Sequence, residues 1–168
     1  PGADAGHTLG RRPVSDELVG LADIRAAAER LRGVAIRTPL VPFEAGPPPV
    51  LLKAESLQPI GAFKIRGAYN AVAQLGPDER ARGVVTHSSG NHAQGLARAA
   101  RLLGIRAVVV MPADAPPVKR ARVQADGAEI VTVAVESGAR EAEADRLAAD
   151  RGLILVPPYD DDRIIAGQ

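Results

Sequence analysis

Lys64 stands out in the stretch GAFKIRG because the chain carries nearly all of its other positive charge on arginine. Of the 21 Lys and Arg residues, only Lys53, Lys64 and Lys119 are lysines. An amine, unlike a guanidinium, can lose its proton and act as a nucleophile. The start of a predicted helix and the apolar neighbours Phe63 and Ile65 disfavour the ammonium form. The sequence therefore predicts a reactive amine at Lys64, although most lysines are solvated surface groups.

The stretch THSSGNHAQG follows a predicted strand and opens a predicted helix. Ser88, Ser89, Gly90 and Asn91 place hydroxyls and backbone N–H groups at that helix start, which is a favourable place for an anion. Open α/β sheets bind ligands beyond the carboxyl ends of their strands. A turn with a simple helix cap is the plainer alternative, but it needs only one serine and one glycine. No nucleotide-binding glycine motif is present.

Three other polar groups receive structural interpretations. His87 and His92 flank the loop, but no third ligand lies at metal spacing, so we expect no metal there. The acidic run at 160–162 is predicted to cap the helix that follows it. Lys119 and the arginines beside it are predicted to lie on a solvated helix face.

From residue 83 onward, short apolar runs alternate with helical patterns. This βαβαβαβ order predicts a parallel sheet with helices packed on its faces, in an α/β fold. The expected strands are 83–87, 106–112, 129–135 and 153–157, and the expected helices are 91–104, 117–128 and 137–152. Earlier in the chain we expect a helix over 15–33, extended segments at 38–43 and 50–56, and a helix over 63–75.

Composition excludes several function classes. With a net charge of +1 and 2% aromatic residues, the chain has no nucleic-acid footprint. It contains no cysteine, which removes thiolate metal sites and thiol nucleophiles. No run of about 20 apolar residues predicts a membrane span. Because the first residues also lack the apolar core of a signal peptide, we expect a cytoplasmic protein.

The stretches LLKAESLQPIGAFKIRGAYNAV and VVTHSSGNHAQGLARAARLLGIRAVVVMP together resemble the fold-type-II pyridoxal-phosphate enzymes. Within them, the chain is similar to the threonine/serine dehydratase (ammonia-lyase) and serine racemase group over residues 37–168. The resemblance implies a two-lobed α/β fold, pyridoxal 5′-phosphate as cofactor and a small amino acid as substrate. It also implies a homo-oligomer.

The resemblance implies roles for individual residues. Lys64 matches the lysine that carries the cofactor and moves the α-proton of the substrate. Phe63 matches the aromatic residue beside the cofactor ring, and Asn91 matches the asparagine that hydrogen-bonds the 3′ oxygen of the cofactor. Ser89 matches the serine that exchanges the proton on the opposite face in racemases. The loop that grips the substrate carboxylate corresponds to Ser88, Ser89, Gly90, Asn91 and His92.

The same resemblance divides the chain into lobes. We expect residues 15–82 to begin the large lobe, 83–157 to form a complete small lobe, and 158–168 to re-enter the large lobe. Residues 1–14 are expected to be a disordered leader. The resemblance implies that the large lobe is only partly present, because we expect the family's glycine-rich phosphate loop and divalent-cation ligands to lie beyond residue 168. The usual Thr-Gly-Ser before Phe-Lys is replaced by Ile-Gly-Ala at 60–62.

Deamination of L-threonine or L-serine to a 2-oxo acid is the predicted reaction, by loss of water and release of ammonia. A serine or aspartate racemase that uses Ser89 as its second acid/base is one alternative. A non-catalytic N-terminal fragment with an anion-binding loop is the other.

Overall fold

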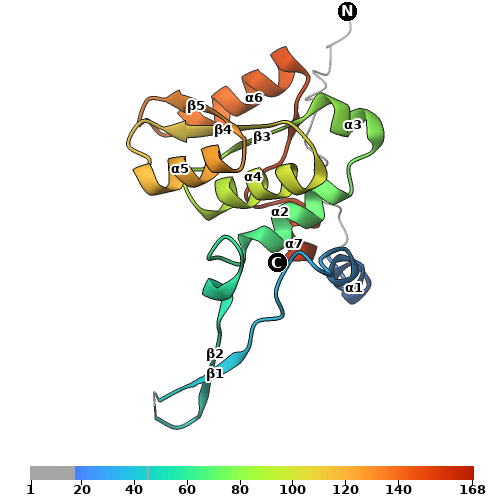
Figure 1. Ribbon diagram of the computed structural model, residues 1–168, viewed down its shortest axis with the longest axis vertical. Coiled ribbons are helices and arrows are strands. Elements are labelled where there is room, and N and C mark those ends of the chain that lie inside the picture. Colours follow the sequence, from blue (N-terminus) through green and yellow to red (C-terminus); the bar gives the residue numbers. More distant parts are fainter. Residues whose placement is uncertain (1–17, 45) are drawn as a thin grey trace, which may run out of the picture.

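A four-stranded parallel sheet forms the centre of the computed structural model, which describes residues 18–44 and 46–168. Its strand order is β5-β4-β3-β6 (Figure 1). The register pairs Val84 with Ala107 on one side and with Ile154 on the other. The strands are β3 (Val84–His87), β4 (Ala107–Pro112), β5 (Glu129–Val133) and β6 (Ile154–Leu155). The predicted parallel α/β sheet is thus confirmed.

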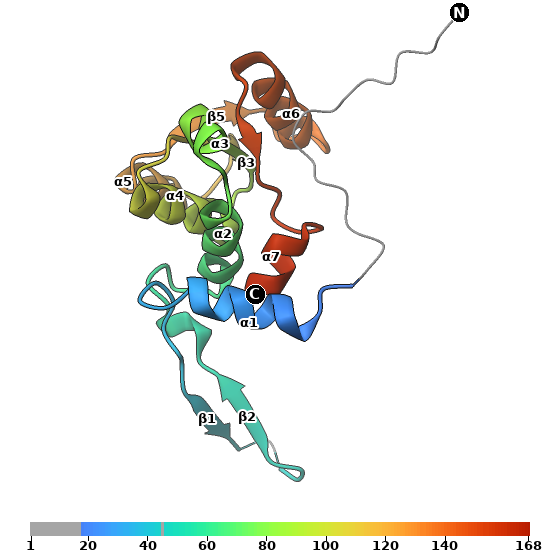
Figure 2. The same ribbon diagram turned by 90° about the vertical axis from the view of Figure 1, so that its right-hand side faces the viewer.

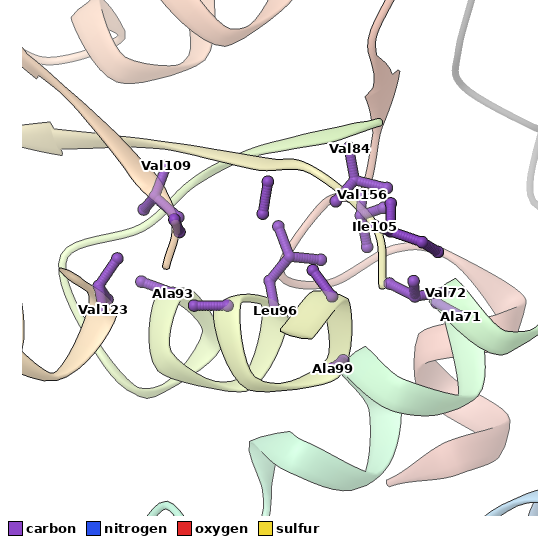
Figure 3. Packing of buried hydrophobic residues seen from close by; sticks show 14 of the residues in the cluster. Ala71, Val72, Val84, Ala93, Leu96, Ala99, Ile105, Val109, Val123 and Val156 are labelled. Carbon is purple, nitrogen blue, oxygen red and sulfur yellow. The ribbon is translucent and has the colours of Figure 1, made fainter. Parts of the chain in front are cut away.

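Helices cover both faces of the sheet, as its continuous apolar strands require. In Figure 1, α6 (Ala139–Arg151) lies above the sheet, while α4 (Asn91–Leu103) and α5 (Pro117–Ala125) lie below it. Side chains alternate along β3, so Val84 packs toward α4 and Val85 toward α6. Leu96 points from α4 into the larger of the two cores (Figure 3).

Most of the chain over residues 18–73 lies below α4 in Figure 1, and Ala71 and Val72 join the core between α4 and the sheet. A helix, α2 (Lys64–Ala73), packs against α4 and against α7 (Asp162–Gly167) near the end of the chain. Figure 2 shows α1 (Leu21–Arg30) crossing this region, and an antiparallel hairpin that projects away from the sheet. The hairpin consists of β1 (Leu40–Phe43) and β2 (Val50–Lys53). A 3-10 turn (Glu55–Leu57) connects it toward α2.

Two helices differ from the sequence prediction. The first begins at Leu21, where Asp23 accepts a hydrogen bond from the Gly20 N–H at 2.9 Å and caps the helix. The predicted cap at Ser15 or Asp16 lies outside the described residues, as does the predicted leader at 1–14. The helix α3 (Pro77–Arg82) was not predicted, although proline in the first turn is a recognised helix start.

The acidic run does cap the last helix, as expected. The Asp161 side chain accepts a hydrogen bond from the Arg163 N–H at 2.8 Å. It also forms an ion pair with the Arg163 guanidinium. Over the described part of the chain, no helix is long and apolar enough to cross a membrane. The division into lobes at 82/83 and 157/158 stays a prediction.

Candidate active site

Lys64 is the first residue of α2, so its amine lies where the sequence placed it, at a helix start. Its Nζ donates a hydrogen bond to the Pro158 carbonyl at 2.8 Å. The same atom lies 5.3 Å from the centre of the Phe63 ring, which is 40% exposed. Desolvation by burial lowers the pKa of the Lys64 amine below its ordinary value. The amine is therefore deprotonated more readily than a surface lysine.

Close packing of α2 on α4 fixes Lys64 relative to the predicted ligand loop. At Gly95 the two helices approach so closely that a Cβ atom would lie 3.0 Å from the Lys64 carbonyl oxygen. It would also lie 3.2 Å from the Cβ of Ala68. Because Gly95 stands on α4 one turn beyond the loop, this contact holds the loop and the lysine in one rigid unit.

The loop between β3 and α4, residues 88–91, is here called the serine loop. The Ser88 N–H donates to the Val110 carbonyl at 3.1 Å, which ties the loop to the neighbouring strand. The Ser88 hydroxyl accepts from the Gly90 N–H at 3.2 Å and closes a tight turn. Among the described residues, the side chains of Ser89 and Asn91 have no hydrogen-bond partner, so both are available to a ligand.

His92 supports the serine loop from inside the protein. It is 3% exposed, and its Nε2 lies 3.3 Å from the Val156 carbonyl. Burial is the main reason why the pKa of His92 falls to about 4, and the nearby charge of Lys64 lowers it further. His92 and Lys64 thus reach carbonyls two residues apart, which brings both side chains to the segment after β6. The predicted contact of His92 with substrate stays a prediction.

An ion-pair network that sequence reasoning missed holds the segment before Lys64. Arg66 donates to both carboxylate oxygens of Glu55 at 2.8 Å. The hydrogen bond from Arg66 lowers the pKa of Glu55 to about 2, against the opposing effect of burial. Thr38 and Gln58 also donate to Glu55. The turn that leads to Phe63 and Lys64 is therefore fastened to the base of the hairpin.

Two contacts of His87, which the sequence analysis had placed beside the loop, were also missed. His87, the residue before Ser88, places Nδ1 at 3.3 Å from a Glu141 carboxylate oxygen. The ring of His87 meets the Tyr159 ring edge-on, with 6.4 Å between centroids. Tyr159 directly follows Pro158, the residue whose carbonyl binds Lys64. An aromatic ring therefore packs against the residue before the serine loop and follows, in sequence, the carbonyl that binds Lys64.

Lys119 is the residue that the sequence analysis misplaced. It was predicted to lie on a solvated helix face, yet it is half-buried, and its Nζ lies 3.6 Å from where a Cβ would stand on Gly90. The sequence contained a usable signal. Lys119 follows β4 as Ser88 follows β3, and segments after neighbouring parallel strands meet at one edge of the sheet.

Metal-binding side chains do not gather at this site. Within residues 18–44 and 46–168, no three His, Cys, Asp or Glu side chains are grouped closely enough to hold an ion. The site instead combines an amine of lowered pKa, an unpaired hydroxyl and an unpaired amide at a helix start.

Comparison with known proteins relates this arrangement to one family. The sequence pattern of the pyridoxal-phosphate dependent enzymes matches residues 31–168. An L-threo-3-hydroxyaspartate ammonia-lyase from a Pseudomonas species is 44% identical over 157 residues, covering 90% of this chain and 49% of the relative. An L-threonine dehydratase of Mycobacterium tuberculosis is 42% identical, covering 95% of this chain and 39% of the relative.

The solved structures give the same picture of the fold. The crystal structure of serine racemase from Dictyostelium discoideum superposes with a TM-score of 0.82 at 37% sequence identity. The match covers 89% of this chain and 50% of the racemase. The chain thus spans between 39% and 50% of the length of these three proteins.

Proposed function

This chain belongs to the family of pyridoxal-phosphate dependent enzymes, and we propose that Lys64 carries the cofactor until the substrate binds and that the reaction is the deamination of a β-hydroxy amino acid. L-Threonine and L-serine are the proposed substrates, and the products are a 2-oxo acid and ammonia. The observation that carries the proposal is the desolvated Lys64 amine, packed through its own backbone against the helix that presents the serine loop.

The residues present fit pyridoxal 5′-phosphate. A lysine of lowered pKa is the side chain that bonds to a carbonyl-bearing cofactor. Phe63 provides an exposed ring 5.3 Å from the amine, and Asn91 provides an amide with no partner among the described residues. When bound, the cofactor supplies an electron sink for the charge that develops at the substrate α-carbon.

The chain's own residues have separate tasks. The serine loop offers hydroxyls and N–H groups to the substrate carboxylate, at the positive end of the α4 dipole. Lys64, once the substrate amine has replaced it on the cofactor and its Nζ is free, would take the α-proton on that Nζ. His92 stays neutral at physiological pH because its pKa is about 4, so it adds no charge beneath the loop. Holding the carboxylate while the base is in place reduces the entropic cost of the proton transfer.

Borohydride reduction after incubation with pyridoxal 5′-phosphate, followed by peptide mapping, tests the assignment of Lys64. We expect the reduced cofactor on Lys64, with little on Lys53 or Lys119. Lys64→Arg is the matched control, because it keeps the charge and removes the nucleophile. Equal labelling of all three lysines, or labelling that survives in Lys64→Arg, would reject the proposal and favour a non-catalytic chain with an anion-binding loop.

Racemisation of serine or aspartate is the second candidate, and the free hydroxyl of Ser89 favours it. A racemase needs an acid on the face opposite the lysine, whereas the elimination reaction does not. In a polypeptide that joins this chain to the remaining half of a relative, Ser89→Ala is expected to lower D-serine formation far more than 2-oxo acid formation from L-serine if Ser89 is the second acid. Loss of D-serine formation in the same variant would identify a racemase.

The lobe boundaries, a cytoplasmic location and a homo-oligomer remain predictions. Sedimentation of the longer polypeptide would check the last of these.

A further inference from the structure

Lys119 places its amine at the edge of the serine loop. Its Nζ lies 3.6 Å from the Cβ position of Gly90, and the side chain is half-buried. Across the described residues it has neither a hydrogen-bond acceptor nor a carboxylate partner. Its neighbours on α5 differ, since Arg120 donates to Thr132 at 2.9 Å and Arg122 donates to Gln94 at 3.4 Å.

The electrostatic surroundings of Lys119 are unfavourable for a cation. It stands in the first turn of the nine-residue helix α5 and beside the start of the 13-residue helix α4. Each helix start carries partial positive charge from unpaired N–H groups. An ammonium between two such ends is repelled by both. The arrangement becomes favourable when an anion lies between Lys119 and the serine loop.

His92 gives independent support for a ligand at this position. It lies in the first turn of α4 and is only 3% exposed. Its Nδ1 is a buried atom with no hydrogen-bond partner in the described structure. Buried polar atoms are normally paired, so the unpaired Nδ1 of His92, the residue that directly follows the serine loop, indicates a polar group whose partner is not among the described residues.

We propose that Lys119 is a substrate-binding residue that pairs with the α-carboxylate held by the serine loop. The inference rests on the proposed function only in taking this loop as the carboxylate site. The N–H and hydroxyl groups of the serine loop are neutral hydrogen-bond donors. Lys119, close to Gly90, would add a charged donor and so a charge-assisted hydrogen bond to the carboxylate. Because every amino acid substrate carries this carboxylate, Lys119 contributes to affinity for the whole substrate class.

Lysine-selective NMR tests the proposal on the chain itself and without the cofactor. Labelling at the ε-carbon gives one resonance each for Lys53, Lys64 and Lys119. We expect the Lys119 resonance and the Gly90 amide to shift with L-serine, and not with L-serinamide, which keeps the ammonium but lacks the carboxylate. The Lys53 resonance is the internal control, because that residue lies on the hairpin and already bonds to Thr38.

Variants give the quantitative test. Lys119→Gln is expected to weaken L-serine binding about tenfold, the size of one charged hydrogen bond, while Lys119→Arg and Lys53→Gln keep most of the affinity. Equal affinity of Lys119→Gln and the unmodified chain would overturn the proposal, as would an equal Lys119 response to L-serinamide. A response to L-aspartate but not to L-serine would overturn the assignment to the α-carboxylate.

The same spectrum separates this inference from the proposed function. Pyridoxal 5′-phosphate is expected to move the Lys64 resonance, and L-serine is expected to move that of Lys119. A silent Lys64 with a responsive Lys119 would reject the cofactor assignment alone. A responsive Lys64 with a silent Lys119 would reject only the carboxylate contact.

Discussion

Two pairs of strands with similar apolar sequences differ completely in burial. Every residue of β3 and β4 is buried, whereas every residue of β1 and β2 is exposed. The central strands lie between two layers of helices, while the hairpin projects away from them (Figures 1 and 2). Burial therefore depends on what covers a strand, and the sequence of the strand alone does not decide it.

The two regions differ in whether they bury their own apolar side chains. The sheet and its helices close a core on both faces, but an isolated two-stranded hairpin is marginally stable in water. Apolar side chains on the hairpin, among them Leu40, Phe43 and Leu51, gain stability only from contact with further polypeptide. Lys64 lies at the junction of the two regions, so its site combines a rigid side and a side of lower local stability.

The largest expected effect comes from truncating matched leucines in the two regions. Leu96→Ala removes a fully buried side chain and leaves a cavity, so it should reduce the free energy of unfolding by about 2–5 kcal/mol. Leu51→Ala removes a side chain that is 56% exposed. This variant should change the free energy of unfolding by less than about 0.5 kcal/mol. Urea titration of both variants checks the difference.

Equal decreases in the free energy of unfolding in Leu96→Ala and Leu51→Ala would contradict the difference between the sheet and the hairpin. They would mean that the hairpin contributes to the cooperative core as fully as α4 does. Amide hydrogen exchange gives an independent check, because amides of β1 and β2 should exchange before those of β3 and β4.

The next effect concerns acid and belongs to the sheet side. His92 has a folded pKa of about 4, below its ordinary 6.5. Between these two pH values His92 is protonated in the unfolded chain and neutral in the folded chain. The free energy of unfolding should therefore decline as the pH falls from about 6.5 toward 4. The decline is on the order of 2–3 kcal/mol. His92→Gln should flatten the profile in this window, as followed by urea midpoints; an unchanged slope would contradict the assignment.

A smaller acid effect belongs to the hairpin side and occurs at lower pH. Glu55 has a folded pKa of about 2, against an ordinary 4.5, chiefly because Arg66 donates to it. Its contribution to stability is complete above pH 4.5 and is lost as the pH falls toward 2. After allowance for its partial exposure, about 1–2 kcal/mol is expected. Glu55→Gln should remove this component while leaving the His92 window unchanged.

Sequence patterns predicted the sheet side of the molecule better than the hairpin side. Continuous apolar runs between helical patterns indicated the parallel sheet, because such runs fit a strand covered on both faces. The pairing of β1 with β2 was not predicted, since exposed apolar residues leave no alternation that marks a buried face. The short helix α3 was missed because six residues provide too few turns for a period.

The candidate site was predictable in its local parts and not in its long-range contacts. Lys64 and the serine loop are marked by residue types and neighbours, so their positions at the two helix starts followed from the sequence. The Lys64 bond to Pro158 joins residues 94 apart in the chain, and Lys119 reaches Gly90 from another helix. Those contacts depend on how α2, α4 and α5 pack, which local patterns do not specify.

The hydrogen bond between Lys64 and the Pro158 carbonyl gives the protein a built-in optical reporter. The chain has no tryptophan and two tyrosines. Tyr159 is attached to the residue that the lysine binds, while Tyr69 packs against the core. If the amine leaves that carbonyl to engage another group, we expect the surroundings of the neighbouring Tyr159 ring, which contacts His87, to change. Tyrosine ultraviolet emission, to which Tyr69 contributes a background, is therefore expected to change when the lysine leaves the Pro158 carbonyl.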